Sequence, residues 1–200
     1  SGGVDPMFLL DFVKKGFSTE KFVVAHFNHK IRQDSDNDQN LVMSVCRENN
    51  IKFVCSNGIG LKNIKNMENN ARIQRWNFLE NAAKTYGCNM VLTAHHLNDY
   101  VENYLIGTIR GIDIISCVMP QKHEKNGIIR FKPFLKDVSK KQIVDISTKR
   151  KLMWNEDSSN DDNTILRNKV RNIIIPEMEK SHNVLVTIPN VIKSLEERIA

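Results

Sequence analysis

The sequence lacks the closely spaced cysteine pairs that zinc ribbons, iron–sulfur sites and redox dithiols need. Its four cysteines lie far apart and form no C-x-x-C pair: Cys46, Cys55, Cys88 and Cys117. We therefore expect a reduced, cytoplasmic protein.

Long apolar runs are also missing. The most apolar stretch, residues 105–119, is interrupted by Arg110 and Asp113, and no apolar signal segment opens the sequence. We expect no membrane association.

The two signs of charge are close to balance. Twenty-nine Lys and Arg stand against 23 Asp and Glu, which gives a formal net charge of +6. This excess favours approach to a polyanion, but many basic proteins bind no nucleic acid, so charge alone does not decide. With 40% hydrophobic residues and no biased tracts, the 200 residues should fold around one main core.

Short apolar runs alternate with amphipathic patterns over the first 110 residues. The pattern predicts strands at 22–27, 51–55 and 90–92, and helices around 7–13, from about residue 35, and at 67–86 and 97–110. Strands that alternate with helices across short turns predict an α/β fold with a doubly wound, mostly parallel sheet.

The regularity weakens after Gly111. Residues 123–127 resemble a turn between short extended pieces, and a capping box from Ser139 to Gln142 predicts a helix to about Lys151. Residues 155–163 form a polar loop, and the tail that follows is mostly helical, punctuated by Pro176 and Pro189.

The glycine loop Ser1-Gly2-Gly3-Val4-Asp5 leads into the first predicted helix, with Pro6 at or near its start. Glycines let backbone N–H groups close around a phosphate, and the helix dipole favours the anion. Gly-Gly turns before helices are common, however, so the loop alone does not establish phosphate binding.

The string His26-x-Asn28-His29-x-x-Arg32 comes just beyond the first predicted strand, where parallel sheets gather their ligands. Its residues suit nucleotide or RNA contacts, and two histidines this close do not complete a metal site. A solvated loop is the alternative.

The string His95-His96-Leu97-Asn98-Asp99-x-x-Glu102 places Asp99 and Glu102 on one face of a helix. Two carboxylates there can bind Mg²⁺ or hold a cationic amine and take its proton, with His95 beside them. An acidic first turn that only complements the helix dipole is an equally good interpretation.

Arg72 and Arg75 are three residues apart on the helix at 67–86, which suits a polyphosphate or an RNA backbone, although surface arginines often serve solubility alone. Trp76 fits the core better than a base-stacking role.

Taken in order, these strings resemble the N-type ATP pyrophosphatases, and among them the tRNA(Ile)-lysidine synthetases. Later strings extend the resemblance to about residue 176: Arg110-Gly111, Lys132-Pro133-Phe134-Leu135, Trp154-x-Glu156-Asp157-x-Ser159-Asn160 and Arg167-Asn168-x-x-Arg171. The last two are particular to this family among its relatives.

The resemblance implies an adenine nucleotide alpha hydrolase-like fold and a two-step reaction that uses ATP and Mg²⁺. Cytosine O2 at the wobble position of tRNA(Ile) would attack the α-phosphate of ATP, releasing pyrophosphate. The ε-amine of free L-lysine would then attack C2 and expel AMP, forming lysidine.

The resemblance also implies roles for individual residues. The implied ATP-binding residues are Ser1, Gly2, Gly3, Val4, Asp5, His26 and Asn28. The implied catalytic residues are Asp5, Arg75, His95 and Asp99, with Asp5 and Asp99 also holding Mg²⁺. The implied contacts to lysine and tRNA are Glu102, Arg167, Arg32, Arg72 and Arg171.

The family's usual residues are replaced at several positions. Pro6 stands in place of a phosphate-loop Ser or Thr, and Asn98 in place of an acid beside Asp99. Asn103 and Asp113 also depart from the pattern. These changes motivate a second hypothesis, a catalytically silent nucleotide- or RNA-binding module. A tRNA thiolase of the same superfamily would need paired cysteines, and in an amide-forming ligase the Arg167-Asn168 string would have no role.

The resemblance also suggests a domain division. We expect a PP-loop catalytic domain at 1–176 that lacks the family's first strand, followed at 177–200 by a helical linker toward absent tRNA-binding domains. The oligomeric state stays open, and a homodimer is compatible with the sequence.

Overall fold

The computed structural model describes residues 1–30, 35–60, 67–156 and 162–199. The chain divides into two compact units, each of which collects separate stretches of sequence. The first unit comprises Ser1–Thr93, His123–Phe131 and Asp145–Glu156, and the second comprises Ala94–Lys122, Lys132–Val144 and Asp157–Ala200.

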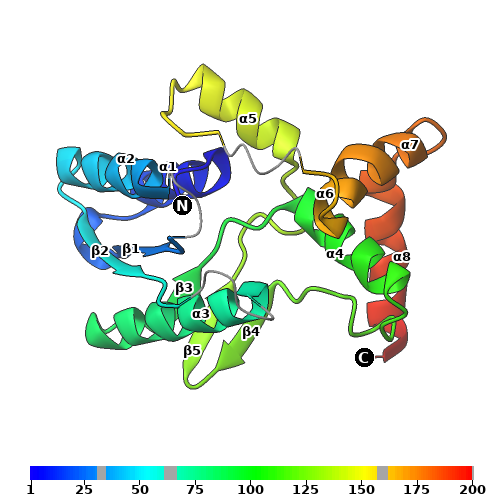
Figure 1. Ribbon diagram of the computed structural model, residues 1–200, viewed down its shortest axis with the longest axis horizontal. Coiled ribbons are helices and arrows are strands. Elements are labelled where there is room, and N and C mark those ends of the chain that lie inside the picture. Colours follow the sequence, from blue (N-terminus) through cyan, green and yellow to red (C-terminus); the bar gives the residue numbers. More distant parts are fainter. Residues whose placement is uncertain (31–34, 61–66, 157–161, 200) are drawn as a thin grey trace. The chain divides into compact units, whose positions relative to one another are not determined.

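The first unit alternates strands with helices, as the sequence predicts (Figure 1). Its elements are α1 (Val4–Gly16), a 3-10 turn at Thr19–Lys21, β1 (Val23–Asn28), α2 (Ser35–Glu48), β2 (Lys52–Asn57), α3 (Met67–Thr85), β3 (Met90–Leu92), β4 (Lys122–Lys125, which starts at the unit boundary) and β5 (Ile128–Phe131). Strand β1 pairs with β2, and β3 pairs with β5, both in parallel.

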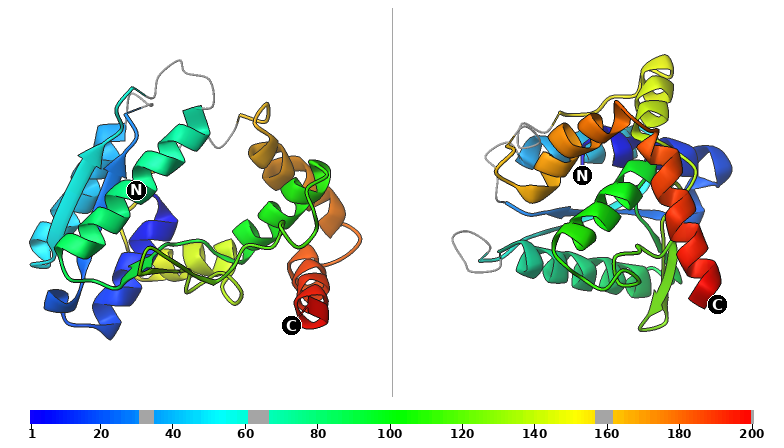
Figure 2. Two further views of the ribbon diagram at one scale, coloured as in Figure 1. Left: turned by 90° about the horizontal axis from the view of Figure 1, so that it is seen from below. Right: turned by 90° about the vertical axis from the view of Figure 1, so that its right-hand side faces the viewer.

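Helices cover both faces of the β1–β2 pair. Side chains alternate across a strand, and Val24 of β1 packs with α1 and α2 around the buried Met7 and Cys46. Phe27 instead packs against Ala71 and Phe78 of α3. Figure 2 shows α3 and α2 on opposite sides of the two strands. The prediction of a doubly wound, parallel α/β fold is therefore confirmed.

The turn predicted at 123–127 is shorter than expected. Residues His123–Lys125 belong to β4, and only Asn126 and Gly127 make the turn, with φ of 54° and 75°. Asn-Gly is the pair best suited to two successive left-handed positions in a hairpin. The polar composition of β4, which is exposed throughout, obscured the strand.

The second unit is mainly helical. It contains α4 (Leu97–Ile109), α6 (Leu166–Lys169), the π turn η3 (Val170–Ile174), α7 (Ile175–Glu179) and α8 (Val184–Ile199). Helix α5 (Lys140–Lys149) crosses the unit boundary, and its predicted capping box is present, since Ser139 and Gln142 exchange hydrogen bonds. Helices α4 and α8 pack together around the buried Tyr100 and Ile192.

The expectation that Pro189 punctuates the helical tail is wrong. Helix α8 begins five residues earlier, at Val184, and continues through Pro189. Proline removes one backbone donor from a helix interior. The burial of Val184 and Ile192 on either side of the proline offsets that loss by anchoring both parts of the helix.

Buried carboxylates join the separate stretches of the first unit. Glu80 of α3 is 7% exposed and accepts hydrogen bonds from Arg130 and Asn126 in the hairpin, the bond from Arg130 Nε being 3.1 Å long. Burial raises the pKa of Glu80, but these bonds outweigh burial and hold the pKa below its ordinary value. The Arg130 guanidinium also stacks 3.9 Å from the centre of the Trp76 ring. Trp76 is a core residue, as predicted.

Helix α4 packs too closely against the following loop to accept a side chain at Gly107. A Cβ there would overlap Cys117 Sγ and lie 2.8 Å from Cys117 Cβ. We expect Gly107→Ala to lower the free energy of unfolding by about 1–3 kcal/mol, because a packed core resists added volume. Urea denaturation of the purified protein measures the change.

Gly16→Ala is the matched control. Gly16 also lies in a helix, but nothing lies within 4 Å of the position its Cβ would take. Alanine should be neutral or slightly stabilising there. Equal stability of the two variants would contradict the close packing at Gly107.

Candidate functional site

The structure divides the predicted site residues between the two units. The first unit holds residues 1–5, His26, Asn28, Arg72 and Arg75, and the second holds His95, Asp99, Glu102, Arg167 and Arg171. Arg32 lies outside the described residues.

The glycine loop ends where α1 begins. Gly3 is the N-cap residue, with extended backbone (φ −68°, ψ 167°) and no side-chain cap, and Asp5 lies in the first turn. The first N–H groups of a helix have no partner within the helix, and the dipole there favours an anion. The local structure therefore suits a phosphate, as the sequence predicts.

Two residues outside the predicted site, Asp38 and Asn155, shape this loop. A Cβ on Gly2 would lie 2.8 Å from Asp38 Oδ1 and 2.9 Å from Asp38 Cα in α2. Asn155 donates its backbone N–H to Gly2 O (2.9 Å) and its side-chain amide to Asp38 Oδ1 (3.0 Å). Only the polar character of residues 155–163 hinted at Asn155.

We expect Gly2→Ala to destabilise the first unit by about 1–3 kcal/mol, because the new methyl group would meet the backbone of α2. Gly3→Ala is the control, since the nearest atom to its Cβ, Ser1 Oγ, lies 4.0 Å away. Thermal unfolding compares the variants, and an unchanged Tm for Gly2→Ala would contradict the close approach.

His26 and Asn28 both lie within β1, so the string that was predicted to follow the strand begins inside it, and both residues are buried. The strand is longer than its apolar run because Asn28 finds polar partners in α2: its amide donates to Asp36 Oδ1 (2.8 Å) and Ser35 O (3.3 Å). Asn28 therefore holds the start of α2, and its contact with nucleotide stays a prediction.

His26 is an uncharged, buried imidazole. It is 3% exposed, and its Nδ1 has no hydrogen-bond partner among the described residues. Burial is the main reason that its pKa falls to about 4, although the Asp38 carboxylate acts in the opposite direction. A buried nitrogen without a partner at the carboxyl end of a strand is compatible with a ligand contact.

The low pKa predicts a loss of stability in acid. Between pH 6.5 and pH 4 the unfolded chain binds a proton at His26 that the folded chain does not, so unfolding becomes easier as the pH falls. We expect His26 to account for about 2 kcal/mol of the stability lost between pH 7 and pH 5. Urea denaturation at both pH values, for wild type and His26→Gln, measures this contribution.

His123→Gln is the control, because His123 is exposed on β4. It should retain the wild-type pH dependence, whereas His26→Gln should flatten it. If the free energy of unfolding falls equally with pH in all three proteins, His26 is not the group responsible for the loss of stability in acid.

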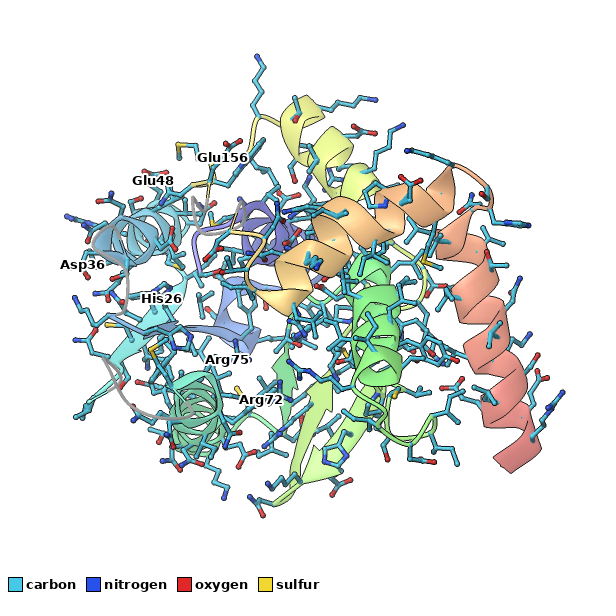
Figure 3. All side chains as sticks on the ribbon, turned by 45° about the vertical axis from the view of Figure 1, so that its right-hand side comes forward. His26, Asp36, Glu48, Arg72, Arg75 and Glu156 are labelled. Carbon is cyan, nitrogen blue, oxygen red and sulfur yellow. The ribbon has the colours of Figure 1, made fainter. Side chains whose placement is uncertain are left out.

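Arg72 and Arg75 both lie on α3 (Figure 3), where Arg72 is exposed and Arg75 is half-buried. Burial is the main cause that lowers the pKa of the Ser1 amino group to about 6, and the charge of Arg75 lowers it further, while Asp38 raises it. The charge of Arg75 therefore acts on the first residue of the glycine loop, and its role toward phosphate stays a prediction.

In the second unit, His96 and Asp99 form the N-terminal cap of α4. The His96 N–H donates to Asp99 Oδ2 (3.0 Å), and His96 Nδ1 accepts from the Asp99 N–H (3.4 Å). His95 immediately precedes this cap. One oxygen of Asp99 thus has a structural role, which the interpretation as a helix-stabilising acidic turn anticipated.

Glu102 is engaged by an arginine of the same unit. Its side chain is 1% exposed, and its two oxygens accept from Arg171 Nε (2.7 Å) and from the terminal NH2 nitrogen (2.8 Å). That NH2 nitrogen also lies 3.5 Å from Asp99 Oδ1. The prediction that Asp99 and Glu102 share a face is confirmed, and a cation already lies against that face. Arg167 is exposed on α6.

Two asparagines that depart from the family pattern have structural roles. Asn98 Oδ1 accepts from the Lys140 N–H (2.8 Å) at the start of α5, and Asn103 donates to Cys117 O (2.7 Å). Lys132, from the Lys-Pro-Phe-Leu string, is buried and donates to Pro120 O (2.6 Å). These contacts could not be predicted from local sequence patterns, because each partner is 12 or more residues away.

No group of three or more His, Cys, Asp or Glu side chains in the described part of the chain is arranged to hold a metal ion. The predicted Mg²⁺ ligands, Asp5 and Asp99, belong to different units. Magnesium often binds only one or two protein carboxylates, with phosphates and water as its other ligands. Asp5 and Asp99 can therefore each contribute one ligand without the other.

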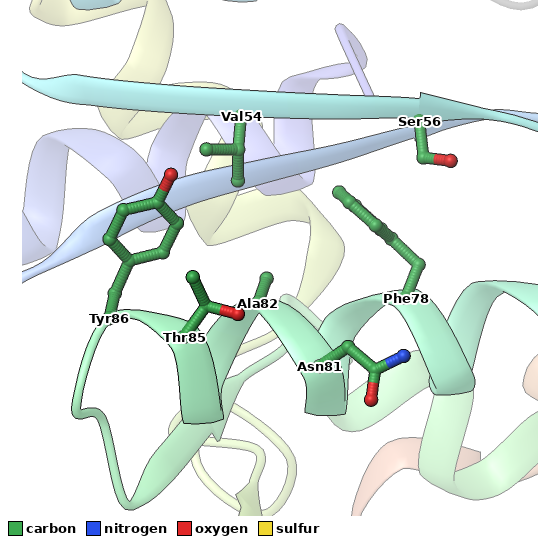
Figure 4. Close-up of a pocket in the computed structure, with 7 residues that line it drawn as sticks. All are labelled: Val54, Ser56, Phe78, Asn81, Ala82, Thr85 and Tyr86. Atoms are coloured by element: carbon green, nitrogen blue, oxygen red, sulfur yellow. The ribbon is translucent and has the colours of Figure 1, made fainter.

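A cavity of about 430 Å³ lies between β2 and α3 (Figure 4). Its lining is largely apolar and contains none of the predicted site residues: Val54, Ser56, Phe78, Asn81, Ala82, Thr85 and Tyr86. None of its lining residues belongs to the glycine loop, so we assign no ligand to it.

The family model for the PP-loop domain matches residues 1–178. The chain belongs to the PP-loop family. This membership establishes the family's ATP-binding fold, and it agrees with a glycine loop that opens a helix at the start of an α/β unit.

Curated relatives cover nearly all of the chain. It is 33% identical over 175 residues to a tRNA(Ile)-lysidine synthase of Mycoplasmopsis pulmonis, covering 88% of this chain and 60% of the relative. It is 32% identical to the tRNA(Ile)-lysidine synthase of Mycoplasma mycoides subsp. mycoides SC, covering 96% of this chain and 50% of the relative. The chain thus spans only about half the length of these relatives.

A solved structure shares the fold. The U34-tRNA thiolase NcsA from Methanococcus maripaludis, solved with its [4Fe-4S] cluster, superposes with a TM-score of 0.77 over 100% of this chain and 70% of that chain. The sequence identity is 15%, so the likeness shows the fold alone. None of the helices in the described part of this chain has the length and apolarity that crossing a bilayer requires.

Proposed function

We propose that this PP-loop chain carries the catalytic part of a tRNA(Ile)-lysidine synthetase, which uses ATP to attach free L-lysine to the wobble cytidine of tRNA(Ile). The observation that carries the proposal is the carboxylate pair on α4, Asp99 and Glu102, which already holds a cation. The curated relatives of this chain bear the corresponding name.

ATP would bind at the glycine loop. Backbone N–H groups at the start of α1 suit a phosphate, and Arg75 brings positive charge toward the loop. As pyrophosphate leaves, its growing negative charge needs a cation, which Arg75 and a magnesium ion held by Asp5 would supply. His26 would contribute a neutral hydrogen-bonding nitrogen.

Lysine would bind at α4. Its ε-ammonium suits the carboxylate pair, and the exposed Arg167 suits its carboxylate. The ε-amine attacks only after losing a proton, and Asp99 is the more accessible carboxylate, since its side chain is 17% exposed against 1% for Glu102. Asp99, with His95 beside it, would therefore handle this proton.

Arg72 is an exposed cation suited to the tRNA backbone. We extend the same role to Arg32 from sequence alone. The net charge of +6 would help a polyanion to approach.

The thiolase alternative is weaker. All four cysteines are free, and none belongs to a cluster of potential metal ligands among the described residues. The silent-module alternative rests on Pro6 and Asn98, and it predicts ATP binding without turnover.

We expect Asp99→Asn to reduce the incorporation of radiolabelled lysine into tRNA(Ile), with ATP and Mg²⁺ present, by about 100-fold or more, because a catalytic proton acceptor is lost. Asp137→Asn is the matched control, because Asp137 is an exposed aspartate in the same unit. It should retain wild-type incorporation.

Nucleotide binding is measured in parallel. Fluorescent ATP titration should show binding to wild type and Asp99→Asn, and weaker binding to Gly3→Ala, which adds a methyl group to the loop proposed to hold the phosphate. ATP binding without lysine incorporation by wild type would favour the silent module and contradict the proposed reaction.

A further inference from the structure

The guanidinium of Arg171 occupies the carboxylate pair of α4. Both oxygens of Glu102 accept hydrogen bonds from it, at 2.7 and 2.8 Å, and it reaches within 3.5 Å of Asp99 Oδ1. Glu102 is one of the most deeply buried side chains described. A buried carboxylate of this kind needs a cation, because an unpaired charge out of water costs several kcal/mol.

A substrate ammonium would need the same oxygens. Both Glu102 oxygens already accept hydrogen bonds from the Arg171 guanidinium, so an ammonium that binds the same oxygens competes with that guanidinium and is repelled by its charge. Glu102 is closed to solvent and Arg171 is 36% exposed, so an incoming ammonium meets the guanidinium before it can reach Glu102. Binding at the pair is therefore possible only if Arg171 moves.

We infer that Arg171 is the resident cation of the amine site and that the ε-ammonium of the substrate replaces it. The inference rests on the proposed function for the identity of the amine. Arg171 balances the negative charge of Glu102 while the site is empty. It also limits which ligands bind, because only a ligand with its own positive charge can replace the guanidinium at the carboxylates. Norleucine, which has the same backbone but a methyl group in place of the aminomethyl group, cannot.

The backbone around Arg171 offers a way to make this exchange. Arg171 lies in the π turn η3, where the Ile175 N–H bonds to Val170 O. A π turn accommodates an extra residue and is less favourable than α-helix, and such turns are frequent at functional sites. Rewinding one residue into regular α-helix would rotate its side chain by about 100°. Val170 and Ile175, at either end, are buried in the core and would stay anchored.

The test compares the affinity for lysine of wild type, Arg171→Lys and Arg171→Ala by titration calorimetry. Removing the tethered competitor should tighten lysine binding, by about tenfold or more for Arg171→Ala. Arg171→Lys should be intermediate, because an ammonium cannot reproduce the two-point contact of the guanidinium. Norleucine should bind none of the three proteins.

A second measurement separates this inference from the proposed function. n-Butylammonium carries the cation without the amino-acid group, and the exchange at the carboxylates requires neither ATP nor tRNA. It should raise the Tm of Arg171→Ala in a saturable manner and leave the wild-type Tm unchanged. Arg171→Lys retains a positive charge beside Glu102, so it still tests whether residue 171 competes with the ammonium if Arg171→Ala fails to fold.

Weaker lysine binding in both variants, or equal binding in all three proteins, would overturn the exchange and show that Arg171 supports the ligand or has a structural role only. Absence of lysine incorporation by wild type would instead contradict the proposed reaction. The response of the variants to n-butylammonium would still report whether Arg171 blocks the pair.

Discussion

A carboxylate removed from water stays ionised only beside a cation, and this requirement recurs at the places where distant stretches of the chain meet. Three buried carboxylates are each bound by an arginine from a much later segment: Asp11 by Arg150, Glu80 by Arg130 and Glu102 by Arg171. The first two pairs join the three stretches that make up the first unit, and the third joins α4 to the π turn of the second. Removing one member would leave an uncompensated charge in the core, so these pairs restrict how each unit can assemble.

The same requirement connects stability with ligand binding at α4. Asp99 uses one oxygen for the cap of its own helix, whereas Glu102 has no contact with solvent and depends on Arg171. The two carboxylates are alike in sequence but differ in environment, since the side chain of Asp99 is 17% exposed and that of Glu102 only 1%. A substrate cation would therefore have to displace Arg171, whose guanidinium already balances the charge of Glu102 in the empty state.

Local spacing made the alternating fold of the first unit predictable, together with the glycine loop before α1 and the shared face of Asp99 and Glu102. Each of these depends on residues a few positions apart. The pairing of Glu102 with Arg171 and the contact between Gly2 and Asp38 could not be predicted, because the partners are separated by many residues and no periodicity links them. Helix α8 passes Pro189 for a similar reason, since buried side chains at either end outweigh the local signal.

The structure also changes the weight of the two substitutions that favour a silent module. Asn98 accepts a hydrogen bond from the Lys140 N–H through its side-chain oxygen. An aspartate oxygen would make this contact equally well, so position 98 has a structural role at the start of α5 that does not depend on which of the two residues stands there. Pro6 is the third residue of α1, where its missing N–H would have had no partner within the helix. What Pro6 removes is a hydroxyl and one backbone donor from the phosphate side of the loop, which leaves the N–H groups of Val4 and Asp5 to meet the anion. The loss therefore concerns the proposed phosphate contacts, and it does not involve the carboxylate pair of α4.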